Sequence, residues 1–293
     1  MKRIRAMLSG IFMSFFFLNS FGTHLAGNEI FYRWVSDSTL EFTVTGYYDC
    51  NGIPAPLSIS MNAKAPSINM YLTNVVTLSR IQLIEDQDNQ GLYNCTQSQA
   101  SLCYDEAIYR GTWKPPARAR DWVVYNYNCC RPTIISPQNI VQNGVYFDCG
   151  INNKDWPIHE AKNSSPFWHN RVPSFPNHLT DTVLNYLFRT VCECNYYTLD
   201  MSTVEYDGDS VFYEFYIPQG NNGIASTYKN GFTFQKPVPL CNTNDVFTIN
   251  PVTGIIPFTP GTPTQTNGSV YAIGIKATEY RYDTVIIGGA FYL

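Results

Sequence analysis

Short segments of alternating apolar and polar residues recur along the chain, and almost no segment has the 3.6-residue period of an amphipathic helix. Alternation with a period of two places apolar side chains on one face of a strand, as in segment 122–128. Polar turns such as Ser36-Asp37-Ser38 separate these segments, as in hairpins. The pattern predicts an all-β protein made of antiparallel sandwiches. We expect strands at 29–35, 40–48, 57–61, 75–84, 106–113, 122–128, 198–203, 210–217, 246–249, 270–278 and 284–287.

Segment 152–163 interrupts the strand pattern with Asn, Asp, Lys and Pro, and we expect a domain boundary there. On both sides the composition is that of strands and turns, with 21 Tyr and 18 Phe but only 14% charged residues. The chain is long enough for two β domains that each bury a core. We therefore expect two antiparallel β-sandwich domains, a disulfide-rich one at 24–155 and a second at 156–293.

The N-terminus has the pattern of a secretory signal peptide at 1–23. Three basic residues within the first five positions precede an apolar segment at about 6–21. This segment is short for a transmembrane helix, and we expect cleavage between Gly22 and Leu25, with a retained N-terminal anchor as the alternative. The mature protein is then expected to have no transmembrane span. We expect it to be secreted or held at the outer cell surface, with the periplasm as the alternative.

Nine cysteines in a strand-rich sequence indicate a disulfide framework formed in an oxidising compartment. Two of them, at 95 and 103, are close enough in sequence to staple a loop. The cysteine at 50 can pair with either member of the adjacent pair 129–130, and the other member can pair with the cysteine at 149. The framework expected in the first domain comprises Cys50, Cys95, Cys103, Cys129, Cys130 and Cys149.

The second half contains Cys192, Cys194 and Cys241, which leave one thiol over because nine is an odd number. The Cys-x-Cys spacing of the first two is a weak metal signal without a nearby pair of histidines. We interpret these three cysteines as structural.

Charge and motifs exclude several classes of function. Loss of the three basic residues of the signal peptide leaves 16 Lys and Arg against 23 Asp and Glu, a net charge of −7. Nucleic acid is therefore not expected as a partner, because phosphate binding needs clustered Lys and Arg. The sequence contains no Gly-x-Ser-x-Gly, His-Glu-x-x-His or nucleotide-binding motif. We expect no enzymatic activity, although a carboxylate pair like that of glycosidases stays open.

A candidate calcium site is formed by Glu205, Asp207 and Asp209 around Gly208. Calcium takes six to eight oxygen ligands at flexible spacing, and alternate acidic residues around a glycine turn present carboxylates on one side of a loop. The alternative is that Asp-Gly is simply a hairpin turn.

Aromatic residues suggest a second candidate site. Trp113, Trp122, Trp156, Phe167 and Trp168 can form a stacking platform for sugar rings, or they can fill a sandwich core. We assign Trp122 to the core. Trp156 and Trp168 lie in loops rich in Pro and Asn, which makes them the candidates for a ligand-facing role. A carbohydrate-binding module that uses exposed aromatics is the alternative to a structural protein.

Several motifs resemble those of large secreted proteins of gliding bacteria, which are exported by the type IX system and built from cadherin-like or immunoglobulin-like repeats. The resemblance covers nearly all of the mature chain. It implies two immunoglobulin/cadherin-like β-sandwich domains and a non-catalytic structural or adhesive role in gliding or attachment. The partners it implies are an extracellular protein, a glycan surface or further copies of the chain. The matching segments are NSSP at 163–166, EYDGDSV at 205–211, INPVTGII at 249–256, GTPTQ at 261–265, HLAGNEI at 24–30, YDCNG at 48–52 and CCR at 129–131.

The same resemblance bears on three positions. Glu279 lies where related repeats carry an acidic residue, which implies that it joins the calcium ligands. Tyr216 occupies a position where the family places a cysteine, which removes the expected partner of Cys192 or Cys194. The family continues into further repeats and a C-terminal sorting domain, whereas this sequence reaches Leu293 without one.

Overall fold

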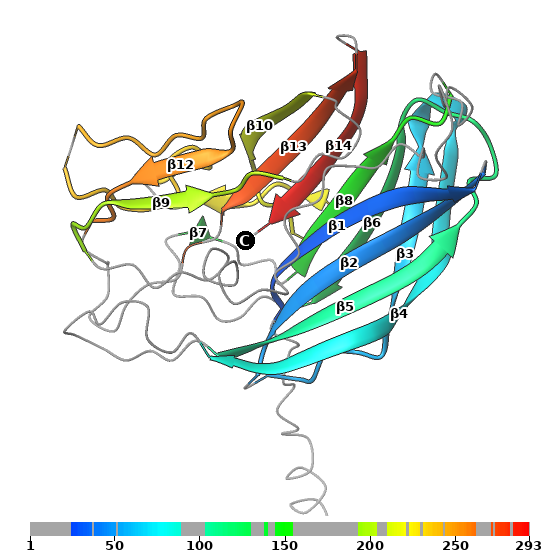
Figure 1. Ribbon diagram of the computed structural model, residues 1–293, viewed down its shortest axis with the longest axis horizontal. Coiled ribbons are helices and arrows are strands. Elements are labelled where there is room, and N and C mark those ends of the chain that lie inside the picture. The colour runs from blue at the N-terminus through cyan, green and yellow to red at the C-terminus, as the bar shows by residue number, and fades with distance from the viewer. Residues whose placement is uncertain are drawn as a thin grey trace, which may run out of the picture.

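A computed structural model shows a protein of antiparallel strands (Figure 1). The residues that it describes are 25–36, 38–50, 52–88, 103–129, 138–139, 144–154, 193–203, 210–220, 223–228, 231–242, 244–261, 271, 273–281 and 284–292. None of the helices in these ranges is long and apolar enough to cross a membrane. The strands are β1 (Leu25–Ser36), β2 (Thr39–Asp49), β3 (Ser58–Ala65), β4 (Met70–Asp88), β5 (Cys103–Trp113), β6 (Trp122–Cys129), β7 (Gln138–Asn139), β8 (Gly144–Ile151), β9 (Tyr197–Asp200), β10 (Ser210–Tyr216), β11 (Thr227–Tyr228), β12 (Ile255–Phe258), β13 (Gly274–Arg281) and β14 (Thr284–Tyr292), with a 3-10 turn, η1 (Pro66–Ile68).

Ten strands form one sheet in the order β1-β2-β5-β4-β3-β6-β8-β14-β13-β10, and every pair is antiparallel. The sheet curls back on itself, because β14 also pairs with β1 through Asn28 and Tyr292. Figure 1 shows β1, β2 and β5 crossing in front of β3, β6 and β8. Two small sheets, β12-β9 and β11-β7, complete the fold. The prediction of an all-β, antiparallel protein is confirmed.

The sheet extends across the predicted domain boundary at 155. β14, from the second half, pairs with β8, from the first half, through Gly289 and Cys149. Residues 155–192 lie outside the described ranges, and the number of domains stays a prediction. For the site described below, the important fact is that both halves contribute strands to one sheet.

The inner cluster is the hydrophobic core enclosed by this sheet. It is made of buried residues of β1 to β6 and β8, with Ala55 and Ala119. Trp122 is fully buried in it, as the sequence predicted. Trp113 is also in this cluster, and its ring packs edge-on against Trp122 with centroids 5.2 Å apart. Trp113 therefore belongs to the core and not to a sugar-stacking platform.

The outer cluster is a second hydrophobic core on the opposite face of β2 and β5. Two of its residues, Tyr47 and Tyr104, come from the first half of the chain, and the others come from the second half. A sheet face that would otherwise meet water is thereby buried, and even Thr45 on β2 is only 2% exposed. The buried residues of the outer cluster are Tyr47, Tyr104, Tyr197, Leu199, Met201, Val238, Phe247, Ile256, Phe258, Ile273 and Ile275.

The predicted strand at 246–249 is wrong, because these residues have no strand structure. Phe247 instead inserts its ring into the outer cluster. It stacks on Phe215 with centroids 5.2 Å apart and meets Phe258 edge-on at 5.4 Å. Ile249 also packs against the outer cluster, so side-chain packing rather than strand pairing holds the segment in place.

Candidate functional site

The predicted calcium ligands fall almost entirely outside the described residues. Glu205, Asp207 and Asp209 lie within 204–209, which the structure does not describe. Glu279 lies on β13 with its backbone opposite Val211, and its side chain is also outside the description. In the described part of the chain, no group of three or more His, Cys, Asp or Glu is arranged to hold a metal ion. The calcium site stays a prediction.

Trp156 and Trp168, the two predicted ligand-facing aromatics, lie within 155–192 and are likewise outside the described residues. Their role stays a prediction.

The predicted disulfide framework of the first domain is described only in part. Cys50 is disulfide-bonded. Cys103 begins β5 and Cys129 ends β6, and their side chains lie outside the description, as do Cys95 and Cys130. Cys149 is a buried thiol on β8, where the sequence predicted a disulfide. Its side chain points into the inner cluster, which accounts for its burial.

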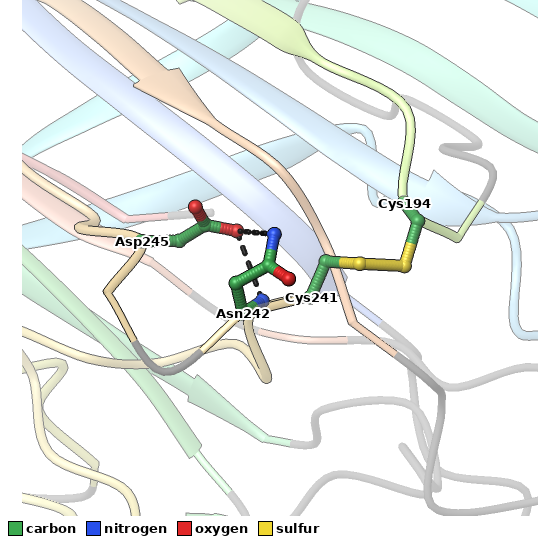
Figure 2. Close-up of a disulfide and its surroundings, with 4 residues drawn as sticks. All are labelled: Cys194, Cys241, Asn242 and Asp245. Atoms are coloured by element: carbon green, nitrogen blue, oxygen red, sulfur yellow. Dashed lines mark hydrogen bonds between the residues drawn. A yellow bond between two sulfur atoms is a disulfide. The ribbon is translucent and has the colours of Figure 1, made fainter.

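The second half is cross-linked by a disulfide between Cys194 and Cys241 (Figure 2). This is one of the pairings that the sequence left open. The two Cα atoms are 5.2 Å apart, and the cysteines are separated by 47 positions in the sequence. Backbone hydrogen bonds hold both cysteines against one segment, because the Cys194 amide donates to Pro260 and the Cys241 amide donates to Thr259. The disulfide thus closes a long loop around the outer cluster.

The residues that follow Cys241 form a tight turn, also drawn in Figure 2. The backbone amide and the side-chain amide of Asn242 both donate to Oδ2 of Asp245, at 3.0 and 3.2 Å. The Asp245 amide donates back to the Asn242 carbonyl. This carboxylate therefore serves the turn.

A cluster of buried acids lies on the outer face of β1, β2 and β5. Glu29 on β1 is directly opposite Thr45 on β2, and Glu106 on β5 is directly opposite Tyr47 on β2. The two glutamates therefore lie on the same face of the sheet, on opposite sides of β2. Their partners in β2, Thr45 and Tyr47, are two positions apart in that strand. The hydroxyl of Tyr47 donates to Oε1 of Glu29 at 3.4 Å. Glu29 is 3% exposed and Glu106 is 2% exposed. We call Glu29, Glu106, Thr45, Tyr47 and Tyr104 the acid cluster.

Burial changes the protonation of this cluster. Removal from water raises the pKa of Glu29 to about 8, and the charge of Glu106 acts in the same direction. Hydrogen bonds from Thr45 and Tyr47 favour the carboxylate and lower the pKa, but they do not outweigh burial. Burial also raises the pKa of Glu106. At neutral pH Glu29 is therefore mainly a neutral carboxylic acid.

Perturbed carboxyl groups cluster at catalytic sites, so the acid cluster is the first place to look for chemistry. It is a carboxylate pair of the kind that the sequence left open. Substrate access is the difficulty, because all five members are at most 5% exposed. Oε2 of Glu106 is also buried without a hydrogen-bond partner. The arrangement is suited to binding and releasing protons inside the protein.

Sequence reasoning missed this cluster. Glu29 and Glu106 were placed in strands, where an acidic residue that alternates with apolar ones normally faces water. The second half covers that face, and no local pattern reports a contact between distant segments.

A second acid, the partly buried Asp148 on β8, lies among groups from both halves of the chain. It is directly opposite Tyr125 on β6, whose ring stacks on Tyr146 with centroids 5.5 Å apart. Burial raises the pKa of Asp148, while a hydrogen bond from Tyr146 and the charges of Lys64 and Lys276 lower it. Lys276 belongs to β13 in the second half. Attraction between Asp148 and Lys276 therefore helps to hold the halves together.

Comparison with known proteins gave no match to any family model, any curated protein or any solved structure.

Proposed function

We propose that this protein is a non-catalytic structural or adhesive protein that is secreted or displayed at the cell surface and takes part in attachment or gliding. The observation that carries the proposal is the cross-linking of an antiparallel β protein, by Cys194–Cys241 and by the disulfide of Cys50. Disulfides form and persist in secreted, periplasmic and surface proteins and are rare in the cytosol. The secretory pattern at 1–23 supports the same location.

The acid cluster also supports a structural role. The strongly perturbed carboxyl group, Glu29, lies beneath the outer cluster rather than in contact with water. A catalytic carboxyl group must come within hydrogen-bonding distance of its substrate.

The partners under this proposal are an extracellular protein, a glycan surface or further copies of the chain, with calcium bound at Glu205, Asp207, Asp209 and Glu279. None of these partners involves nucleic acid, given the acidic composition.

Fractionation of the native host, with and without protease treatment of intact cells, tests the location. Surface display predicts that protease removes the protein from the cell fraction, and free secretion predicts the protein in the medium. A periplasmic marker and a cytosolic marker, both protected, are the controls. Recovery of the protein with the cytosolic marker, with all its cysteines reduced, would contradict the proposal.

A carbohydrate-binding function is the second candidate, and a tyrosine-bearing sheet face favours it. Lys64 on β3 has Tyr71 on β4 and Val123 on β6 as its direct neighbours, so the three side chains share the outward face. Tyr127 is four positions after Val123 on β6 and therefore lies on the same face. Tyr71 is 64% exposed and Tyr127 is 47% exposed. Exposed aromatic rings beside polar groups are suited to stacking on sugars.

Glycan-array binding separates the two candidates. Carbohydrate binding predicts a signal that is lost on Tyr71→Ala with Tyr127→Ala, or on Trp156→Ala with Trp168→Ala. Val252→Ala is the matched control, because Val252 is an exposed apolar residue of the second half. An array without signal for the folded protein leaves the structural role as the proposal.

A further inference from the structure

The face of β1, β2 and β5 that carries the acid cluster is also the face on which the second half of the chain rests. Tyr47 belongs to both, because its ring is a member of the outer cluster and its hydroxyl reaches Glu29. Tyr104 also belongs to both the acid cluster and the outer cluster. Its ring packs edge-on against Tyr47 with centroids 6.0 Å apart. Two carboxyl groups therefore lie where one half of the protein meets the other.

We propose that Glu29 and Glu106 form a proton-controlled latch, which holds the second half against β1, β2 and β5 while the carboxyl groups are neutral and loosens it when they ionise. The proposal goes beyond the structural role inferred above and does not depend on it.

The outer cluster, which includes Tyr47 and Tyr104 of the acid cluster, is made of hydrophobic side chains. The buried members of the outer cluster that come from the second half are aliphatic, methionine or aromatic, as are the partly buried residues packed against them. Ionisation of Glu29 therefore places charge beneath an apolar layer, which costs free energy unless water enters. Water can enter if the cover moves away.

Within the acid cluster, the groups near Glu29 carry no positive charge. From β2 they are Thr45 and Tyr47, and from β5 they are Glu106 and Tyr104, of which Glu106 adds a like charge. Among the described residues, the cover contributes two phenols to the outer cluster: Tyr197 from β9 is a buried member, and Tyr271 packs against it.

The arginines on the same sheet face are engaged elsewhere. Arg33 lies four residues further along β1 and meets Glu41, its direct partner on β2, at 2.7 Å. Arg110 on β5 lies 3.9 Å from the same carboxylate. The two arginines are about half-exposed to solvent, and the Glu41 side chain between them is partly buried.

The sign of the effect follows from proton binding. In the closed latch the pKa of Glu29 is about 8, and an uncovered glutamate returns toward its ordinary pKa of 4.5. At pH values between these two pKa values, Glu29 is protonated in the closed form and ionised in the open form. The population of the open form therefore increases as pH rises. The opening equilibrium is expected to increase by roughly tenfold per pH unit for each such proton, and to level off above pH 8.

Hydrogen–deuterium exchange of the full chain between pH 5 and pH 9, corrected for the intrinsic rate of each amide, measures this opening. Four segments report on the latch: 43–48, 104–108, 197–201 and 273–277. In the wild-type protein their protection should fall by about three orders of magnitude between pH 5 and pH 8 and then level off. Segment 122–125 of the inner cluster should keep its protection.

Glu29→Gln removes the titrating group while retaining its shape and hydrogen-bonding capacity. Its latch segments should lose most of the pH dependence, and Glu106→Gln should reduce it. Glu41→Gln is the matched control, because Glu41 is a partly buried glutamate on the same face that is ion-paired with Arg33, and it should behave like the wild type.

The wild-type profile is sufficient to overturn the proposal, even if a variant fails to fold. Protection of the latch segments that does not change with pH would refute the latch. The same pH dependence in segment 122–125 would also refute it, because the whole protein would then be unfolding. A Glu29→Gln variant that keeps the wild-type pH dependence would exclude Glu29 as the controlling group.

Discussion

Tyr47 donates its hydroxyl hydrogen to Glu29 at 3.4 Å, across the β1–β2 pair and beneath the cover of the second half. The bond favours the ionised form of Glu29, because a carboxylate accepts hydrogen bonds more strongly than a carboxylic acid does. Burial acts in the opposite direction and dominates, so the pKa of Glu29 remains raised, at about 8. The two residues together set the pH at which charge enters this interface.

Tyr47→Phe should destabilise the protein, and more so at high pH. The variant loses one buried hydrogen bond, with a cost of about 1 kcal/mol in the free energy of unfolding. Because that bond lowers the pKa of Glu29, its loss raises the pKa further, and the added cost appears at and above pH 8. Chemical denaturation at pH 5 and pH 9 measures both values. Tyr71→Phe, at an exposed ring, is the control, and an equal loss at the two pH values would contradict the assignment.

Loss of the Cys194–Cys241 disulfide should destabilise the second half of the chain. Cross-links over this sequence separation contribute about 4 kcal/mol in the chain-entropy model, because they restrict the unfolded chain. Cys194→Ser with Cys241→Ser should therefore lower the free energy of unfolding by up to that amount, measured by denaturation without reductant. Asn242→Ala is the matched control, because it removes the hydrogen bond from the Asn242 side-chain amide to Asp245 but keeps the disulfide, and it should cost about 1 kcal/mol. A double variant no less stable than this control would contradict the prediction.

Much of the strand content could be predicted from local pattern. The predicted strand at 122–128 corresponds to β6, Trp122–Cys129, because Trp122 and Val124 alternate with residues of the outer face. β8 has the same alternation, with Val145, Phe147 and Cys149 directed inward, but it was not among the strands that we predicted. The signal for β8 is present in the sequence.

The acid cluster could not be predicted in this way. Glu29 and Glu106 have ordinary positions in their strands, and their burial depends on residues more than 90 positions away, such as Leu199 and Ile275. Pairing of β14 with β8 and β1 brings those segments close, and strand propensity does not specify which strands pair. Long-range contacts therefore decide which polar residues are buried.

Gly254→Ala should destabilise the turn that leads into β12. Gly254 has φ of +71°, and an added Cβ would lie 2.9 Å from the backbone of Met201. Backbone strain and the steric clash should together cost about 2–3 kcal/mol in the free energy of unfolding. Gly231→Ala is the control, because its φ is +92° but nothing lies within 4 Å of the added Cβ. It should show the cost of backbone strain alone, and equal losses in the two variants would contradict the close contact with Met201.

Calcium should stabilise the protein if Glu205, Asp207 and Asp209 converge as predicted. Three carboxylates in one loop repel each other, and a divalent ion relieves that repulsion while supplying the bonds that oxygen ligands favour. An ion that binds only the folded state raises stability by mass action, by about 2.7 kcal/mol at a concentration 100 times the dissociation constant. The melting temperature should then rise with calcium and fall with chelator. Asp207→Asn with Asp209→Asn should abolish the shift, whereas Asp245→Asn, in a turn that uses its carboxylate internally, should retain it. A melting curve that does not change at millimolar calcium would identify Asp207-Gly208-Asp209 as a turn without a metal.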